Sequence, residues 1–155
     1  MHESAIQVIK CLEDEYIFSG DRFGYLRQFK LTKKTKDQQS CNPKFASIYN
    51  LVLFKDYGKV LDGMFISLKF TSNNNFLLFG GGLGNLVRMR REHDNEGNLL
   101  DRFTHLELYT KGINNDVDFY HAFSEAHVGP VSSISVTKDD NIISTGHKGY
   151  IKSWN

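Results

Sequence analysis

The stretch that decides the fold is His127–Asn155, HVGPVSSISVTKDDNIISTGHKGYIKSWN. It holds three short segments with strand-like composition, Val131–Val136, Asn141–Gly146 and Gly149–Trp154. The first two are separated by Lys138–Asn141, which is rich in residues that favour turns, and the last two meet at a glycine turn. Short strands joined by such turns form antiparallel hairpins. The stretch therefore predicts a three-stranded meander.

Two earlier parts of the chain repeat this layout. Their segments are Ala5–Lys10, Tyr16–Gly20 and Gly24–Phe29, then Met64–Phe70, Phe76–Gly80 and Gly84–Met89. The aligned glycines Gly24, Gly84 and Gly149 are 84 − 24 = 60 and 149 − 84 = 65 residues apart. Repeats of a supersecondary unit indicate a stacked architecture.

The middle strand of each repeat has its own pattern. Tyr16–Phe18, Phe76–Phe79 and Ile142–Ile143 are continuous apolar runs without alternation. Such runs are expected where a strand is buried on both faces. We therefore expect the three meanders to stack face to face.

On these residues, His127–Asn155 resembles a WD repeat, which begins near a Gly-His pair and closes with Trp-Asp. Here Ala126-His127 and Trp154-Asn155 stand at these places, and Phe29 and Met89 stand where the closing Trp would be in the other repeats. The resemblance implies an all-β fold, a partial WD-repeat-like β-propeller of three antiparallel meander blades, the last lacking its fourth strand. As one incomplete propeller segment, residues 1–155 divide into blades at about 3–56, 57–126 and 127–155.

The resemblance also implies a buried hydrogen-bond network of a His, a Ser or Thr of the second strand, an Asp of the next turn, and the Trp. His127, Thr145 and Trp154 fill three of these places, and Lys148 stands at the Asp place. A lysine cannot accept a hydrogen bond, so the network is expected to be truncated. Phe23 and Leu83 stand at the Asp place in the other two blades, so no network is expected there.

The outer strands are less clearly marked. The fourth strand of the first blade is expected within Phe45–Phe54, and that of the second is either Arg102–Tyr109 or Val117–Phe123. The third repeat stops after its third strand, so we expect further sequence, a second chain or self-association to complete the propeller. A strand that a partner adds beside Gly149–Trp154 would be β-augmentation.

Composition narrows the class of protein. The chain has 155 residues, 40% hydrophobic and 24% charged, which suits one packed domain. The net charge of +1 gives no support to a nucleic-acid partner. The two cysteines, Cys11 and Cys41, form no disulfide framework, and no apolar run is long enough to span a membrane. We expect a cytoplasmic or nuclear protein.

No sequence motif indicates catalysis. The six histidines show no metal-ligand spacing, and no nucleophile elbow occurs. The loop Gly80–Asn85 lacks the final glycine of a dinucleotide fingerprint, and a hairpin turn is the favoured interpretation. We therefore expect no enzyme activity, metal, cofactor or small-molecule substrate. A small-molecule or nucleotide site at Gly80–Gly84 remains as an alternative.

The favoured function is a non-catalytic scaffold for protein–protein interaction. Propeller turns are presented side by side at one end of a rigid scaffold, where binding residues concentrate. The residues expected to contact a partner there are Asp21, Arg22, Phe23, Tyr57, His147 and Lys148. Packing of Phe23 between blades is the competing interpretation. A nucleic-acid-associated scaffold using Lys33–Lys36 and Arg88–Arg91 is the third alternative.

Overall fold

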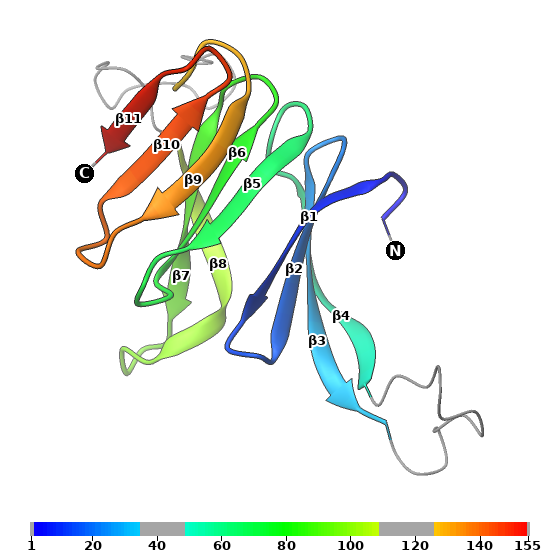
Figure 1. Ribbon diagram of the computed structural model, residues 1–155. Helices are drawn as coiled ribbons and strands as arrows, with labels where there is room; N and C mark the ends of the chain where they lie inside the picture. The colour runs from blue at the N-terminus through cyan, green and yellow to red at the C-terminus, as the bar shows by residue number, and fades with distance from the viewer. Residues whose placement is uncertain (1, 35–48, 109–125, 155) are drawn as a thin grey trace.

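The computed structural model describes residues 2–34, 49–108 and 126–154, and these parts of the chain are all-β without helices (Figure 1). They form three antiparallel sheets of four, four and three strands. The first sheet contains β1 (Ile6–Leu12), β2 (Tyr16–Asp21), β3 (Tyr25–Lys33) and β4 (Tyr49–Lys59). The second contains β5 (Phe65–Phe70), β6 (Phe76–Gly81), β7 (Leu86–His93) and β8 (Leu99–Leu108), and the third β9 (Val131–Val136), β10 (Ile142–Gly146) and β11 (Ile151–Trp154).

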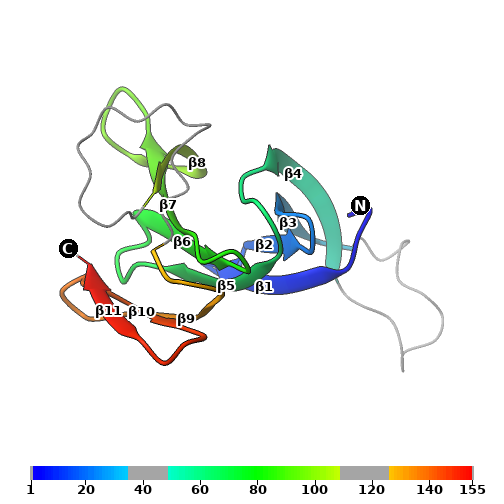
Figure 2. The same cartoon turned by 90° about the horizontal axis from the view of Figure 1, so that it is seen from above.

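Each sheet is a meander in which strands consecutive in the chain pair with one another. The sheets are stacked so that their first strands lie together: β5 contacts β1 on one side and β9 on the other. Figure 2 shows this arrangement from above, with the later strands of each sheet spreading away from β1, β5 and β9. The predicted all-β architecture of three antiparallel meanders is therefore confirmed.

Two of the aligned glycines are required by close packing between sheets. Gly24 and Gly84 have φ values of +89° and +87°, which favour glycine. A Cβ atom on Gly24 would lie 1.8 Å from the carbonyl oxygen of Leu61, and one on Gly84 would lie 2.0 Å from that of His127. The turns of the first and second sheets therefore lie directly against the segments that lead into the next sheets.

The middle strands are buried as predicted only in the second sheet. There Leu77 and Phe79 pack toward the first sheet and Leu78 toward the third, and all three are fully buried. In the first sheet Phe18 is buried but its neighbour Ile17 is only partly so. The third sheet likewise buries Ile142 and only partly buries Ile143. The described residues thus cover one face of each outer sheet and both faces of the central one.

The fourth strands correct two details of the sequence prediction. β4 spans Tyr49–Lys59, so it continues beyond the expected range and through the expected boundary at residues 56–57. The fourth strand of the second sheet is β8, which begins at Leu99 and overlaps the first of the two candidate segments. The other candidate, Val117–Phe123, lies outside the described residues.

Candidate interaction site

A buried polar network lies within the third sheet, on the face that packs on the second. His127 is 1% exposed, and its Nε2 lies 2.7 Å from the Ser144 hydroxyl. The Trp154 indole donates to the same hydroxyl at 2.8 Å. The hydroxyl at the centre of the network therefore belongs to Ser144, and the prediction of Thr145 is wrong. Adjacent residues of a strand point to opposite faces, and Thr145 instead bonds Ser132 on the outer face.

The network is truncated, as the lysine at position 148 predicts. His127 Nδ1 is buried and has no hydrogen-bond partner among the residues that the structure describes. Burial, with a smaller contribution from the charge of Lys152, holds the pKa of His127 below its ordinary value. The imidazole is therefore a packed, hydrogen-bonded core residue whose burial favours the neutral form.

A second network lies in the first sheet, where none was expected. His2 Nε2 lies 2.7 Å from the Ser19 hydroxyl, and His2 Nδ1 lies 3.0 Å from the Asp21 carboxylate. Asp21 also accepts hydrogen bonds from the backbone N–H groups of Phe23 and Tyr25. Burial alone would raise the pKa of Asp21, but these backbone bonds and the bond from His2 hold it below its ordinary value.

The first-sheet network corrects two predictions. Asp21 is 2% exposed, so it organises the turn and is not available as a partner contact. Phe23 occupies the position of the network Asp in a WD repeat, and we expected no network for that reason. That expectation is also wrong, because Asp21, two residues before Phe23, supplies the carboxylate. A sequence signal was present: His2 and Ser19 are 17 residues apart, as are His127 and Ser144.

The second sheet replaces this network with apolar packing, as predicted. Phe79 and Met89 stand five residues before and after Gly84, as Ser144 and Trp154 do around Gly149. Both side chains are buried in the cluster between the first and second sheets.

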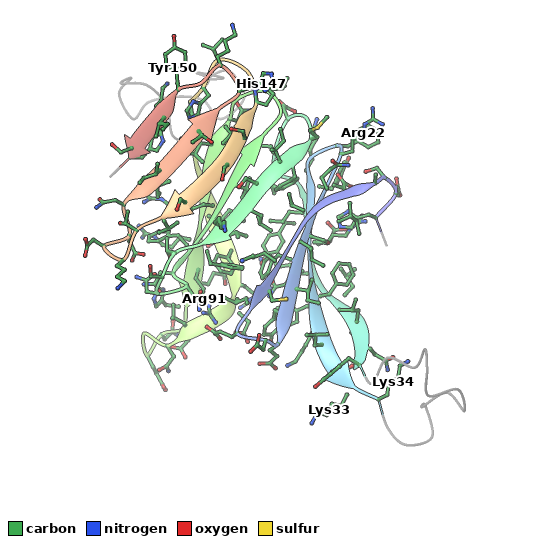
Figure 3. All side chains as sticks on the ribbon, viewed as in Figure 1. Arg22, Lys33, Lys34, Arg91, His147 and Tyr150 are labelled. Atoms are coloured by element: carbon green, nitrogen blue, oxygen red, sulfur yellow. The ribbon has the colours of Figure 1, made fainter. Side chains whose placement is uncertain are left out.

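The turns at one end of the stack form the candidate interaction surface, which we call the turn face. They are residues 22–23, 82–83 and 147–148, together with Met64 and Val128 from the segments that enter the second and third sheets. Arg22 and His147 lie at this end in Figure 3. Phe23 is 59% and Leu83 54% exposed, and Met64 and Val128 are also exposed. Leu83, Met64 and Val128 were not predicted, although Leu83 occupies the same turn position as Phe23.

Arg22, Phe23, His147 and Lys148 are all exposed at the turn face, as expected of contact residues. Within the described residues, neither Arg22 nor Lys148 forms an ion pair, so both charges face solvent. The alternative that Phe23 packs between blades does not fit its exposure.

Tyr57 lies elsewhere, in β4, and belongs to the contact between the first and second sheets. Its hydroxyl donates to Gln28 Oε1 at 2.7 Å and accepts from the backbone N–H of Phe103 at 3.2 Å. Burial raises the pKa of Tyr57 well above its ordinary value. Tyr57 is therefore a packing residue rather than a surface contact.

The glycine-rich loop is also explained by packing. A Cβ atom on Gly80 would lie 2.5 Å from Val131, and one on Gly81 would lie 2.6 Å from Leu61. The glycines let side chains of the neighbouring segments approach the backbone, which leaves no space for a phosphate at these two positions.

The described residues of the two basic segments form no common surface. Arg91 is buried, where it pairs with Glu13 at 2.7 Å and Asp101 at 3.0 Å and so ties the first sheet to the second. Arg88 and Arg90 both stack on the ring of Phe76. Lys33 and Lys34 lie at the opposite end of the molecule from Arg22 (Figure 3), and Lys36 lies outside the described residues.

The described part of the chain has no group of three or more His, Cys, Asp or Glu side chains placed to hold a metal ion. Over the same residues, no helix has the length and apolar character to cross a membrane. No protein-family model matches the chain, and no curated protein matches it either.

Proposed function

We propose that this chain is a non-catalytic protein–protein interaction scaffold, forming part of a WD-repeat-like β-propeller that further sequence or a partner chain completes. The observation that carries the proposal is the exposed apolar turn face. Turns ordinarily carry Gly, Asn, Asp, Ser or Pro. Phe23 and Leu83 instead expose large side chains at equivalent turn positions, on sheets that hold them rigidly.

The opposite end of the stack provides the comparison. Its turns are Glu13–Glu15, Thr71–Asn75, Asp94–Asn98 and Lys138–Asn141. None of these described turns carries an exposed large apolar side chain. Among the described turns, exposed large apolar side chains therefore occur at one end, where Arg22 and Lys148, which form no ion pair with the described residues, also lie. Aromatic and arginine side chains are enriched at the energetic centres of protein interfaces.

The relation to WD repeats is part of the proposal, and the two polar networks support it. In both, a histidine that precedes the first strand bonds a serine of the second strand 17 residues later. The third strand then supplies Trp154 in one sheet and Phe29 in the other, each ten residues beyond the serine. His2 and Phe29 also have their rings 6.5 Å apart.

Completion of the propeller is supported by the uncovered outer faces. The register of the first sheet places Ile9, Leu51 and Leu53 on its outer side, and all three are exposed. Ile151 is exposed on the outer side of the third sheet. Leu51 and Leu53 are two residues apart on β4 and so neighbours on this side, and exposed apolar side chains of this kind indicate a surface that another protein element covers. Since the cysteines form no disulfide framework, we place this assembly in the cytoplasm or nucleus.

The experiment is quantitative affinity purification of the tagged chain from its own cells, with paired variants. The double variant F23S/L83S removes the apolar side chains of the turn face, and L99S removes an exposed leucine near the opposite end. We expect a defined set of proteins to be retained by the wild type and by L99S and to fall at least ten-fold with F23S/L83S. Identical sets from all three proteins would refute the role of the turn face.

A further inference from the structure

A pocket of about 340 Å³ lies where the first strands of the three sheets end, at the opposite end of the stack from the turn face. Figure 1 shows these strands, β1, β5 and β9, side by side, and β5 contacts both of the others. Two consecutive residues of each first strand line the pocket, together with three residues of the turn after β5. The lining residues are Lys10 and Cys11 of β1, Lys69 and Phe70 of β5, Ser135 and Val136 of β9, and Thr71, Ser72 and Asn74 of the turn.

The repeat in the fold brings these residues together. Lys10, Lys69 and Ser135 occupy the same position in their sheets. Each pairs with the middle-strand residue that precedes the aligned glycine by six residues, which is Phe18, Leu78 or Ile143 respectively. Stacking of the sheets therefore places two lysines and a serine from equivalent positions at one pocket.

Neither lysine lies on an uncovered outer face. Phe18 packs toward the second sheet and Leu78 toward the third, and residues paired across two strands lie on the same face of a sheet. Lys10 and Lys69 therefore lie on faces that neighbouring sheets cover. Phe70 also packs against the core between the first and second sheets, so packing holds this part of the pocket in place.

The lining carries two positive charges and no carboxylate. Among the described residues, neither Lys10 nor Lys69 forms an ion pair. Of the carboxylates bonded to lining residues, Glu13 pairs with Arg91 at 2.7 Å, and Asp140 accepts a backbone N–H from the turn after β5. Lys69 is partly buried, where solvent and salt screen a charge less than at an open surface. The pocket is therefore suited to an anion that two ammonium groups can neutralise.

We propose that this pocket binds the phosphate group of a small molecule. Lysine binds phosphate as a point charge, and a phosphate dianion matches the two ammonium groups of Lys10 and Lys69. Ser72 and Ser135 add hydroxyl groups to the lining. Pockets that bind small molecules have volumes of about 300–1,000 Å³, and this pocket is at the lower end of that range. The site goes beyond the scaffold function and does not depend on the turn face.

Titration of the 155-residue chain with inorganic phosphate, at constant ionic strength, tests the proposal by nuclear magnetic resonance. We expect saturable shifts of the backbone amides of residues 69–74 and 135–136. K10Q and K69Q each raise the dissociation constant about five-fold, as the loss of one exposed ion pair predicts. K69R keeps the charge and binds as the wild type does. The control K33Q removes the same charge outside the pocket and leaves the dissociation constant unchanged.

Three further ligands identify what the pocket recognises. Glucose without phosphate does not bind, and acetate binds more weakly than phosphate because its single charge can neutralise only one lysine. Glucose 6-phosphate distinguishes the two sources of a phosphate group. Tighter binding than inorganic phosphate assigns the site to a phosphate ester, and equal binding assigns it to the phosphate group alone.

Three results would overturn the proposal. They are shifts that do not saturate at these amides, wild-type affinity in both K10Q and K69Q, and acetate binding as tight as that of phosphate. Lys10 is exposed, so K10Q decides the outcome even if K69Q does not fold. No substitution here alters the turn face, so failure of phosphate binding and failure of partner retention are separate results.

Discussion

Substitution of Gly80 by alanine tests the packing between sheets at its tightest point. The new Cβ atom would lie 2.5 Å from Cγ1 and 2.7 Å from Cβ of Val131, whereas carbon atoms in contact prefer separations of about 3.5–4.0 Å. Val131 is fully buried in β9, and side chains in a close-packed core have little room to move aside. The backbone of one sheet must therefore shift relative to the other.

The expected size of the effect follows from two opposing terms. Overpacking of a close-packed core costs about 1–3 kcal/mol. Replacing glycine by alanine also reduces the conformational freedom of the unfolded chain, and this stabilises the folded state by about 0.4–1 kcal/mol. We expect a net loss of about 1–2 kcal/mol in the free energy of unfolding. For a chain of this size that corresponds to a fall of roughly 2–8 °C in Tm.

Urea and thermal unfolding followed by circular dichroism measure this loss. G82A is the matched control, in the turn that directly follows β6, because its nearest neighbour is Met64 Cγ, in an exposed side chain that can move aside. We expect G82A to be as stable as the wild type or slightly more so. In G80A/V131A the added methyl occupies vacated space, so the loss is smaller than the sum of the single variants by about 1 kcal/mol. Wild-type stability of G80A, or strict additivity in the double variant, would refute the packing.

Further predictions concern the networks and the exposed surfaces. S144A leaves the buried groups of His127 and Trp154 without their shared partner and should lower stability by about 1–3 kcal/mol, whereas T145A should change it by no more than about 0.5 kcal/mol, as urea midpoints would show. The folded pKa of His127 is lowered by burial, so its contribution to stability is complete above the unfolded value of about 6.5 and is lost as pH falls toward the folded pKa. Urea midpoints from pH 7.5 to 5.5 should therefore fall for the wild type and fall less for H127Q; equal slopes would contradict the assignment. F23S/L83S should leave the unfolding midpoint unchanged while losing bound partners.

The fold was predictable because turn residues and apolar runs recur around three glycines. Gly24 and Gly84 have positive φ and lie against the segment that leads into the next sheet. Both positions therefore require glycine, and the spacing between them gives the length of the repeat. The burial of the middle strands was predictable only for the second sheet. Periodicity describes what a strand is suited to contact, but it does not say whether a neighbour is present to cover Ile17 or Ile143.

The networks were harder to predict because neighbouring residues of a strand point to opposite faces of the sheet, so an error of one residue selects the wrong side chain. Ser144 and Thr145 are both plausible hydroxyl donors in sequence, and only the pleat of β10 decides which one faces His127. Asp21 was misplaced for a related reason: a carboxylate two residues before the expected position still reaches His2. Tyr57 lies away from the turn face because β4 continues to Lys59, beyond the range expected from the sequence.

Nuclear magnetic resonance of the Gly20 α protons tests the stacking of the sheets most directly. An added Cβ atom at Gly20 would lie 2.4 Å from Cγ of Phe65, so one α proton points into the face of that ring. The account predicts a strong upfield ring-current shift for this proton, lost in F65L, and cross-relaxation between it and the ring protons of Phe65. A Gly20 α shift typical of an ordinary strand, with no cross-relaxation to Phe65, would contradict it.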